Sequence, residues 1–294
     1  MARVTTWLRG SLCVLLLLLA ECATPPPQRI SAVREKSARI GDLVQYYRTV
    51  GQGPPLLLIH GLTNTWRIWS PYIDALAEKH QLIIPDLRGH GDTKNPASTL
   101  TQKQVARDML ALLDNLGVKQ VQLVGYSFGG NVALRMAAIQ LERVEAMIVI
   151  AGWHQLLGTT RKSLEDKAVT GLPRDWYLGA ARTWHPGGDE QVQQLYRQGI
   201  AAALDEDFAM PDVATIRART LIIQGDRDDY FPLDVPSDLY RKIPKAQLWI
   251  IPNTTHATVF YQDIAPPGED FGGGRLAARI FPEVADAFLS GKAP

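Results

Sequence analysis

Short apolar runs alternate with longer segments of helical periodicity along most of this chain. The apolar runs predict strands near residues 43–49, 56–60, 82–85, 121–124, 146–151, 220–224 and 247–251. The helical segments lie near residues 66–79, 101–116, 128–140, 234–242 and 274–289. Strands that alternate with helices of this length favour an α/β fold with a doubly wound, mostly parallel sheet.

The alternation stops between residues 152 and 219. Two helix-like runs remain there, near 173–184 and 189–204, together with several large aromatic side chains. We interpret 152–219 as a helical insertion between two parts of one core, 40–151 and 220–294. Its aromatic residues either form the core of the insertion or line a substrate pocket, and the pocket candidates are Trp153, Trp176 and Trp184. A second irregular stretch, 257–274, is either a mobile lid or an ordinary loop.

The first 22 residues predict export. Arg3 and Arg9 precede the largely apolar residues 11–20, a segment of signal-peptide length that is too short to span a bilayer. The mature protein is therefore expected in the bacterial cell envelope, in the periplasm or outside the cell.

The end of this segment, Leu-Ala-Glu-Cys at 19–22, resembles the lipobox of bacterial lipoproteins. The resemblance implies that Cys22 becomes a lipidated first residue and attaches the protein to a membrane. Glu21 departs from the pattern, so cleavage after Cys22 or Ala23 without lipidation is the competing outcome. The polar, proline-containing stretch 23–39 is expected to be a tether.

Composition narrows the function classes. The chain has 294 residues, of which 46% are apolar, enough for one large α/β core with an insertion. Without the signal segment, 29 basic and 29 acidic residues remain, so nothing indicates nucleic-acid binding. Both cysteines lie at the N-terminus, at 13 and 22, which leaves no pair for an internal disulfide in the mature chain. No metal-ligand spacing or glycine-rich phosphate loop is present, so no metal and no cofactor is expected.

The clearest chemical signal is Gly-Tyr-Ser-Phe-Gly at residues 125–129. A predicted strand leads into it and a predicted helix leads out of it, which is the setting of a nucleophile elbow. The chain reverses so sharply there that the serine backbone is strained, and glycines two residues away on either side remove clashing Cβ atoms. Ser127 is thereby presented above the sheet, close to the positive end of the following helix.

A serine hydroxyl needs a base, and the base needs a group that fixes its tautomer. Downstream, the apolar strand near 220–224 ends in an acidic loop with Asp226, Asp228 and Asp229. The strand near 247–251 runs into His256. The chain order Ser, Asp, His, with the acid and the histidine each just after a strand, is the order found in α/β-hydrolases.

On these motifs the sequence resembles the α/β-hydrolase superfamily between roughly residues 40 and 290. Ile-His-Gly-Leu at 59–62 is similar to the family's HG-x turn. Residues 85–93 are similar to its D-x-R-G-x-G-x-S turn, with Thr93 in place of serine. Gly225, Asp228 and Pro232 follow its G-x-x-D-x-x-x-P pattern.

The resemblance implies an eight-stranded sheet with a helical cap inserted after the sixth strand. It also implies a nucleophile Ser127, a base His256 and an acid Asp228, with the backbone N–H groups of Leu62 and Phe128 forming the oxyanion hole. Asp226 and Asp229 are then expected to cap or solvate the turn.

The remaining histidines have less specific positions. His60 and His90 are expected to hydrogen-bond backbone in structural turns, and His80 is expected at the surface. His154 and His185 fall in the insertion, where they either contact substrate or belong to its structure.

These features favour a carboxylic ester hydrolase, similar to carboxylesterases and lipases, that acts on a small-molecule ester through an acyl-enzyme. The same triad also serves lactonases, aminopeptidases, acyltransferases and carbon–carbon bond hydrolases. A non-catalytic ligand-binding protein is a third class, which the complete triad disfavours. The serine in the elbow also disfavours haloalkane dehalogenases and epoxide hydrolases, because their nucleophile in this fold is an aspartate.

Overall fold

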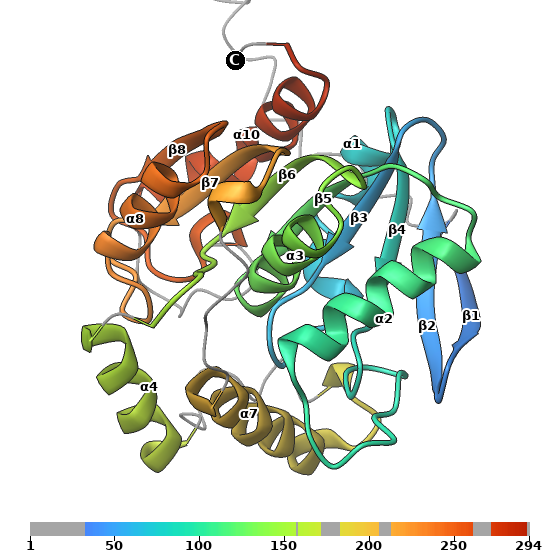
Figure 1. Cartoon of the computed structure of the whole chain (residues 1–294), viewed down its shortest axis with the longest axis horizontal. Coiled ribbons are helices and arrows are strands. Elements are labelled where there is room, and N and C mark those ends of the chain that lie inside the picture. Colours follow the sequence, from blue (N-terminus) through green and yellow to red (C-terminus); the bar gives the residue numbers. More distant parts are fainter. Residues whose placement is uncertain (1–32, 157, 172–182, 206–212, 261–271, 293–294) are drawn as a thin grey trace, which may run out of the picture.

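The computed structural model describes residues 33–156, 158–171, 183–205, 213–260 and 272–292. The predictions for Cys22 and Trp176, and for 261–271 of the second irregular stretch, lie outside these residues. Within them, an eight-stranded sheet carries helices on both faces (Figure 1), which confirms the predicted α/β class. None of the helices in the described ranges has both the length and the apolar character needed to cross a membrane.

The strands follow the order β1-β2-β4-β3-β5-β6-β7-β8 across the sheet. β1 and β2 are antiparallel to their neighbours, and the remaining pairs are parallel. The strands are β1 (Arg34–Ile40), β2 (Leu43–Val50), β3 (Pro55–Ile59), β4 (Gln81–Pro85), β5 (Val121–Tyr126), β6 (Val144–Ile150), β7 (Arg219–Gly225) and β8 (Ala246–Ile251).

The α-helices of the described residues are α1 (Ile73–Ala77), α2 (Gln102–Asn115), α3 (Phe128–Ile139), α4 (Gly158–Thr170), α7 (Gly188–Asp205), α8 (Asp234–Lys242) and α10 (Gly272–Leu289). Short 3-10 turns are η2 (Trp66–Trp69), η3 (Val213–Thr215) and η4 (Thr258–Phe260).

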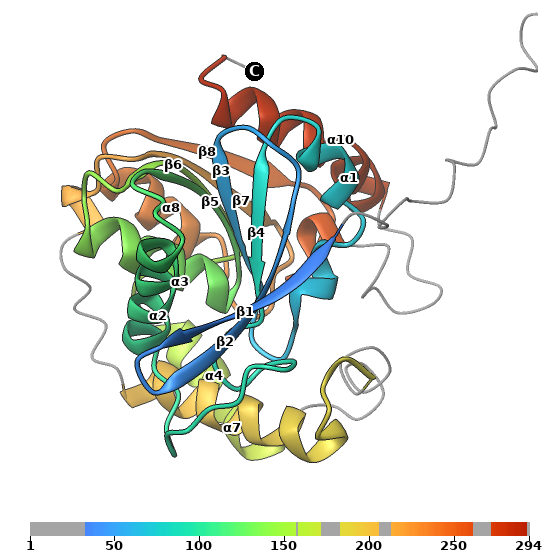
Figure 2. The same ribbon diagram turned by 90° about the vertical axis from the view of Figure 1, so that its right-hand side faces the viewer.

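Two apolar layers hold the helices against the sheet. In β3, Leu57 and Ile59 face the layer that contains α2, α3 and α8, whereas Leu56 and Leu58 face the layer that contains α1 and α10. This alternation follows from the twofold side-chain period of a strand buried on both faces. Figure 2, which views the sheet edge-on, shows α2 and α3 on one side and α1 and α10 on the other. The parallel strands are thereby fixed so that their carboxyl ends share one edge of the sheet.

The segment between β6 and β7 leaves the sheet at that edge. Its described part contains α4 and α7, and both views place these helices beyond one end of the strands (Figures 1 and 2). A separate apolar cluster forms between this segment and the core, with Trp153, Leu164 and Tyr196 packed near Phe231.

The structure differs from the sequence expectations in three elements. Residues 34–39, the last part of the tether expected at 23–39, form most of edge strand β1, which pairs with β2 through its backbone while most of its side chains stay exposed. The helix expected at 66–79 is divided into η2 and α1, because Pro71 has no N–H for an intrahelical hydrogen bond and its ring would clash with the preceding turn. Helix α4 was not predicted, since its sequence has almost no apolar stripe.

Candidate active site

Ser127 lies at the turn between β5 and α3 with φ 51° and ψ −117°, a strained conformation for a residue with a side chain. Neighbouring backbone explains both flanking glycines. A Cβ on Gly125 would lie 2.4 Å from the Gly129 carbonyl oxygen, and a Cβ on Gly129 would lie 2.1 Å from that of Ile59. The Ser127 N–H donates to the Ile150 carbonyl at 2.8 Å, which fixes the elbow to the neighbouring strand β6.

Three side chains form a continuous hydrogen-bonded chain at the carboxyl edge of the sheet. His256 Nε2 lies 2.9 Å from Ser127 Oγ, and His256 Nδ1 lies 2.8 Å from Asp228 Oδ2. Because a carboxylate only accepts, His256 carries its proton on Nδ1, and Nε2 is left to accept the serine proton. Asp228 is 5% exposed and His256 8%, so the chain is shielded from water except at the serine end.

Asp228 is held by four donors, which separates it from the other two acids of its loop. Its Oδ1 accepts the backbone N–H groups of Tyr230 at 2.8 Å and Phe231 at 3.0 Å. Its Oδ2 accepts from Gln224 Nε2 at 2.6 Å as well as from His256. These bonds orient the carboxylate toward the imidazole and supply the donors that a buried carboxylate requires.

The neighbouring acids have structural partners. Asp226 Oδ1 accepts the Thr254 N–H at 3.2 Å and ties the acid loop to the segment before His256. Asp229 Oδ2 lies 3.3 Å from Lys167 Nζ on α4. Asp226 therefore supports the turn, as the sequence interpretation expects, whereas Asp229 joins the turn to helix α4.

Residues 61–64 form a tight turn in which the Asn64 N–H donates to the Gly61 carbonyl at 3.2 Å. Thr63 has a φ of 62°, which is unusual for a β-branched residue. Its N–H donates to His90 Nε2 at 3.1 Å, and its hydroxyl donates to the Leu62 carbonyl at 2.6 Å. These bonds hold the strained turn in one conformation.

Two residues that line the cavity beside Ser127 have backbone N–H groups with no acceptor in the described residues. Leu62 and Phe128 line the same cavity as Ser127, and neither backbone N–H donates a hydrogen bond to any group in the described part of the chain. The Phe128 N–H belongs to the first turn of α3, where backbone donors have no intrahelical acceptor. The pair has the character of an oxyanion hole: fixed donors next to the nucleophile.

His60 and His90 support this turn as buried, neutral rings. Leu87 N–H donates to His60 Nε2 at 3.0 Å, while His60 Nδ1 lies 2.8 Å from the Gly61 carbonyl. His90 Nδ1 likewise lies 3.0 Å from the Arg88 carbonyl. Each ring thus donates from Nδ1 and accepts at Nε2. Burial lowers the pKa of His60 to about 3 and that of His90 well below 6.5, which keeps both rings in this state.

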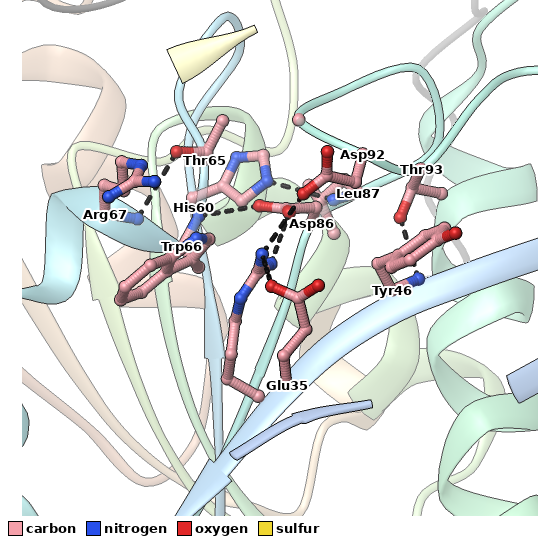
Figure 3. Close-up of polar contacts among 12 residues, drawn as sticks. Glu35, Tyr46, His60, Thr65, Trp66, Arg67, Asp86, Leu87, Asp92 and Thr93 are labelled. Carbon is pink, nitrogen blue, oxygen red and sulfur yellow. Dashed lines mark hydrogen bonds and ion pairs between the residues drawn. The ribbon is translucent and has the colours of Figure 1, made fainter. Parts of the chain in front are cut away.

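An ionic network adjoins this turn. Arg48, which is buried, pairs with the carboxylates of Glu35, Asp86 and Asp92. Figure 3 shows these three carboxylates close together. Asp86, at the end of β4, pairs with Arg48 and accepts the Trp66 N–H at 3.0 Å. Burial raises the pKa of the Asp86 carboxyl, and the adjacent Arg48 charge offsets part of that rise. Arg48 also reaches Glu35 on β1 at 2.6 Å, so the edge strand is coupled to the base of the site.

The cavity above Ser127 has a volume of about 50 Å³, enough for a few water molecules. Its lining is largely apolar, and Trp153 stacks on Phe231 with ring centroids 4.3 Å apart. The side chains from the cap segment and the acid loop that line it are Trp153, Leu164, Tyr196, Ile200, Ala203, Tyr230 and Phe231.

Among the three tryptophans proposed for the pocket, only Trp153 lines the cavity in the described residues. Trp184 is half-buried and packs against the apolar layer that contains α1 and α10. Its aromatic character alone did not reveal which surface it would meet.

The other histidines lie away from the cavity lining. His80, expected at the surface, is 3% exposed, and burial lowers its pKa. Its Nε2 lies 3.6 Å from an Asp286 carboxylate oxygen on α10. His154 is buried with its Nε2 2.9 Å from Asp238 Oδ2, and His185 lies beside the His90 ring at 6.0 Å.

Sequence reasoning missed three residues of the site. Gln224 orients the acid, and its signal was a polar side chain at the end of an otherwise apolar strand. Asn64 lines the cavity directly after the HG-x turn. Gly199 lines it from the interior of α7, where glycine is unfavourable for helix formation and so calls for a packing reason.

Comparison of the sequence with protein families indicates the same fold as the structure. The model of the alpha/beta hydrolase family matches residues 56–266, more than half of the chain. The chain belongs to the alpha/beta hydrolase family.

Within the described residues, no group of three or more histidine, cysteine, aspartate or glutamate side chains could hold a metal ion.

Several curated members of the family are similar to this chain. A 2-hydroxymuconate semialdehyde hydrolase from a Pseudomonas species is 29% identical over 241 residues, 71% of this chain and 82% of that protein. A soluble epoxide hydrolase from a Corynebacterium species is 35% identical over 118 residues, 40% of this chain and 41% of that protein. With four of the curated relatives, the matched region spans only about half of their length, from 41% to 56%.

Among solved structures, a meta-cleavage product hydrolase from Pseudomonas fluorescens superimposes with a TM-score of 0.69 at 23% identity. The match covers 88% of this chain and 98% of that one. At this level of identity the likeness shows the fold.

Proposed function

We propose that this protein is a serine hydrolase that cleaves carboxylic esters through an acyl-enzyme on Ser127. The observation that carries the proposal is the hydrogen-bonded chain from Ser127 to His256 to Asp228, with contacts of 2.9 and 2.8 Å. Ser127 shares a cavity with Leu62 and Phe128, whose backbone N–H groups have no acceptor among the described residues.

The geometry allows a complete reaction cycle. Ser127 Oγ attacks the ester carbonyl carbon while its proton moves to His256 Nε2. The negative charge on the carbonyl oxygen is stabilised by the N–H groups of Leu62 and Phe128, and that on Asp228 stabilises the imidazolium. His256 then gives the proton to the departing alkoxide, which leaves an ester on Ser127. Water, deprotonated by His256, attacks this ester, releases the acid and restores the serine.

The cavity supports a short or compact acyl group. Within the described residues the cavity beside the serine is small, about 50 Å³, and its walls are largely aromatic and aliphatic. Because each added methylene changes the fit to an apolar pocket by about 1–3 kcal/mol, we expect kcat/KM to fall steeply as the acyl chain lengthens.

A second candidate is hydrolysis of a carbon–carbon bond by the same residues. It is favoured by the similarity to the 2-hydroxymuconate semialdehyde hydrolase, which is 29% identical over most of its length. Epoxide hydrolysis is less favoured despite the names of some relatives, because the elbow of this chain carries a serine rather than an aspartate.

The test is turnover of a series of aryl esters, lactones and ring-cleavage dienones by wild type and Ser127→Ala. We expect short-chain esters to be the best substrates, and the variant to lose about 10⁴–10⁶ in kcat while staying folded. Retention of several per cent of activity by the variant would refute the role of Ser127. Preference for a dienone over every ester would establish the second candidate instead.

A further inference from the structure

The interior of helix α7 contains a glycine that its helical position does not explain. Gly199 lies eleven residues after the first residue of the 18-residue helix, where alanine would be the better helix former. A Cβ at Gly199 would lie 2.4 and 2.5 Å from the two Cδ atoms of Leu62 and 3.0 Å from its Cγ. The Leu62 side chain therefore occupies the space that a side chain at position 199 would need.

Helix α7 is fixed to the core in the two turns that precede Gly199. Gln191 Nε2 donates to the Gly89 carbonyl at 2.8 Å, and Gln198 Nε2 donates to the Ser98 carbonyl at 2.8 Å. Leu195 packs so closely on Gly89 that a Cβ there would lie 2.9 Å from its Cδ2. These contacts oppose a shift of the helix away from Leu62 when a group is added at position 199.

The turn that carries Leu62 is fixed from the other side. The next residue, Thr63, is held at a φ of 62° by His90, which lies in the same turn as Gly89. A displaced Leu62 side chain would move against this fixed turn. Such a displacement alters the site, because Leu62 lines the cavity beside Ser127 and its backbone N–H is one of the two without an acceptor in the described residues.

We propose that Gly199 is a positioning residue. It leaves room on α7 for the Leu62 side chain, and this contact fixes the position of the Leu62 N–H in the oxyanion hole. This rests on the proposed serine hydrolase function, in which the Leu62 N–H binds the developing oxyanion. The consequence is that the oxyanion hole is complete only while α7 is docked on the 89–98 segment. Docking of α7 is thus coupled to catalysis, and not only to substrate binding.

The experiment compares wild type, Gly199→Ala, Leu62→Ala and the double variant. The readouts are kcat and KM for a short aryl ester, and the rate at which a fluorophosphonate probe labels Ser127. We expect Gly199→Ala to lower kcat and the labelling rate about tenfold with KM changed less than about twofold, because a displaced donor is lost mainly in the transition state. Its circular dichroism spectrum should match that of wild type, which shows that the variant is folded.

The double variant separates the clash with Leu62 from any other effect of the added Cβ. Leu62→Ala will itself lower activity, but it removes the side chain that the Cβ would displace. Adding Gly199→Ala to it should therefore change kcat less than about twofold. A full tenfold loss in that background, or wild-type kcat in Gly199→Ala, would overturn the proposal. If the single variant melts lower than wild type, the comparison within the Leu62→Ala background still decides.

Ala201→Gly is the matched control, since it makes the reverse exchange at an exposed position of the same helix. It should leave kcat and labelling unchanged. A similar loss in this control would show that activity depends on the helix propensity of α7. It would refute the proposal that Gly199 acts through its contact with Leu62. Failure of the proposed function looks different: wild type itself would neither hydrolyse esters nor react with the probe.

Discussion

Asp228 shows how a single carboxylate is selected from three in one short loop. Asp226, Asp228 and Asp229 differ little in sequence context, yet only Asp228 is buried and reaches the imidazole. Two backbone N–H groups and the Gln224 amide fix its orientation before any substrate arrives. Such preorganisation is what an acid of a catalytic triad requires.

We expect Asp228→Asn to lower kcat by about 10⁴, because an amide facing Nδ1 favours the wrong histidine tautomer. Asp226→Asn and Asp229→Asn should each cost less than about tenfold, since their partners are Thr254 and Lys167. Steady-state kinetics of the three purified variants, with circular dichroism to verify folding, measures this. Equal losses in Asp226→Asn and Asp228→Asn would mean that the acid has been assigned to the wrong residue.

Residues whose role depends on local sequence were accessible to prediction. Gly125, and the spacing from Gly225 to Asp228, follow from backbone geometry within a few residues, whereas Gly129 is also required by the Ile59 carbonyl of the neighbouring strand β3. His80 and Trp184 were misplaced because their burial depends on groups distant in sequence: Asp286 of α10 for His80, and the apolar layer that contains α1 and α10 for Trp184. The roles of Gly199 and Gln224 became visible only with their partners in place.

At the scale of elements, long strands and amphipathic helices were predicted, and elements without an apolar stripe were not. β1 is stabilised chiefly by backbone pairing at the edge of the sheet, so its side chains carry little hydrophobic signal. Helix α4 is similarly polar, but it makes specific contacts with the acid loop. These contacts link the segment between β6 and β7 to His256, the proposed base.

The link runs through Lys167. Its Nζ lies 3.3 Å from Asp229 Oδ2 and 4.2 Å from the centroid of the Tyr230 ring. The Tyr230 ring in turn lies 4.8 Å from that of His256. Ser163, one turn earlier on α4, donates to the Asp229 carbonyl at 3.3 Å. Helix α4 therefore restrains the loop that covers one side of the imidazole.

We expect Lys167→Met to lower kcat/KM about fivefold, because a cation–π contact of about 0.5–1 kcal/mol and an ion pair that order this loop are both lost. Lys162→Met is the control, since Lys162 lies on the same helix but pairs only with the exposed Asp166. Kinetics with a short aryl ester compares the two. Equal effects at both positions would indicate general weakening of α4 and no specific restraint of Tyr230.

At the scale of the whole molecule, the site depends on a buried polar layer as well as on two apolar ones. His60 and His90 join the HG-x turn to the 86–93 turn, and the ion pair of Arg48 with Asp86 joins that turn to β2. Both rings must stay neutral, because each accepts a backbone N–H at Nε2. The catalytic architecture is therefore coupled to the protonation of groups that take no part in the reaction.

This coupling predicts acid sensitivity of the fold. Burial lowers the pKa of His60 to about 3, and it also lowers the pKa of His80, His90 and His154 below 6.5. Below pH 6.5 the unfolded chain binds protons at these histidines that the folded protein does not bind. The free energy of unfolding should then fall by about 1.4 kcal/mol per pH unit for each such histidine, down to its folded pKa. Burial raises the pKa of Asp86, and this raises the free energy of unfolding as the pH falls. This is one group against the four histidines, so the net effect of acid is still destabilising.

Urea unfolding at pH 7.5, 6.0 and 5.0 measures this dependence, and His90→Gln isolates one contribution. A glutamine side chain can still accept an N–H but does not titrate, so the variant should take up about one proton fewer on unfolding between pH 6 and 5. Its stability should therefore fall less steeply with acid than that of wild type, even if it is less stable at pH 7.5. Identical slopes for the two proteins would show that His90 is already protonated in the folded state, and the hydrogen bond that it accepts from Thr63 would have to be reassigned.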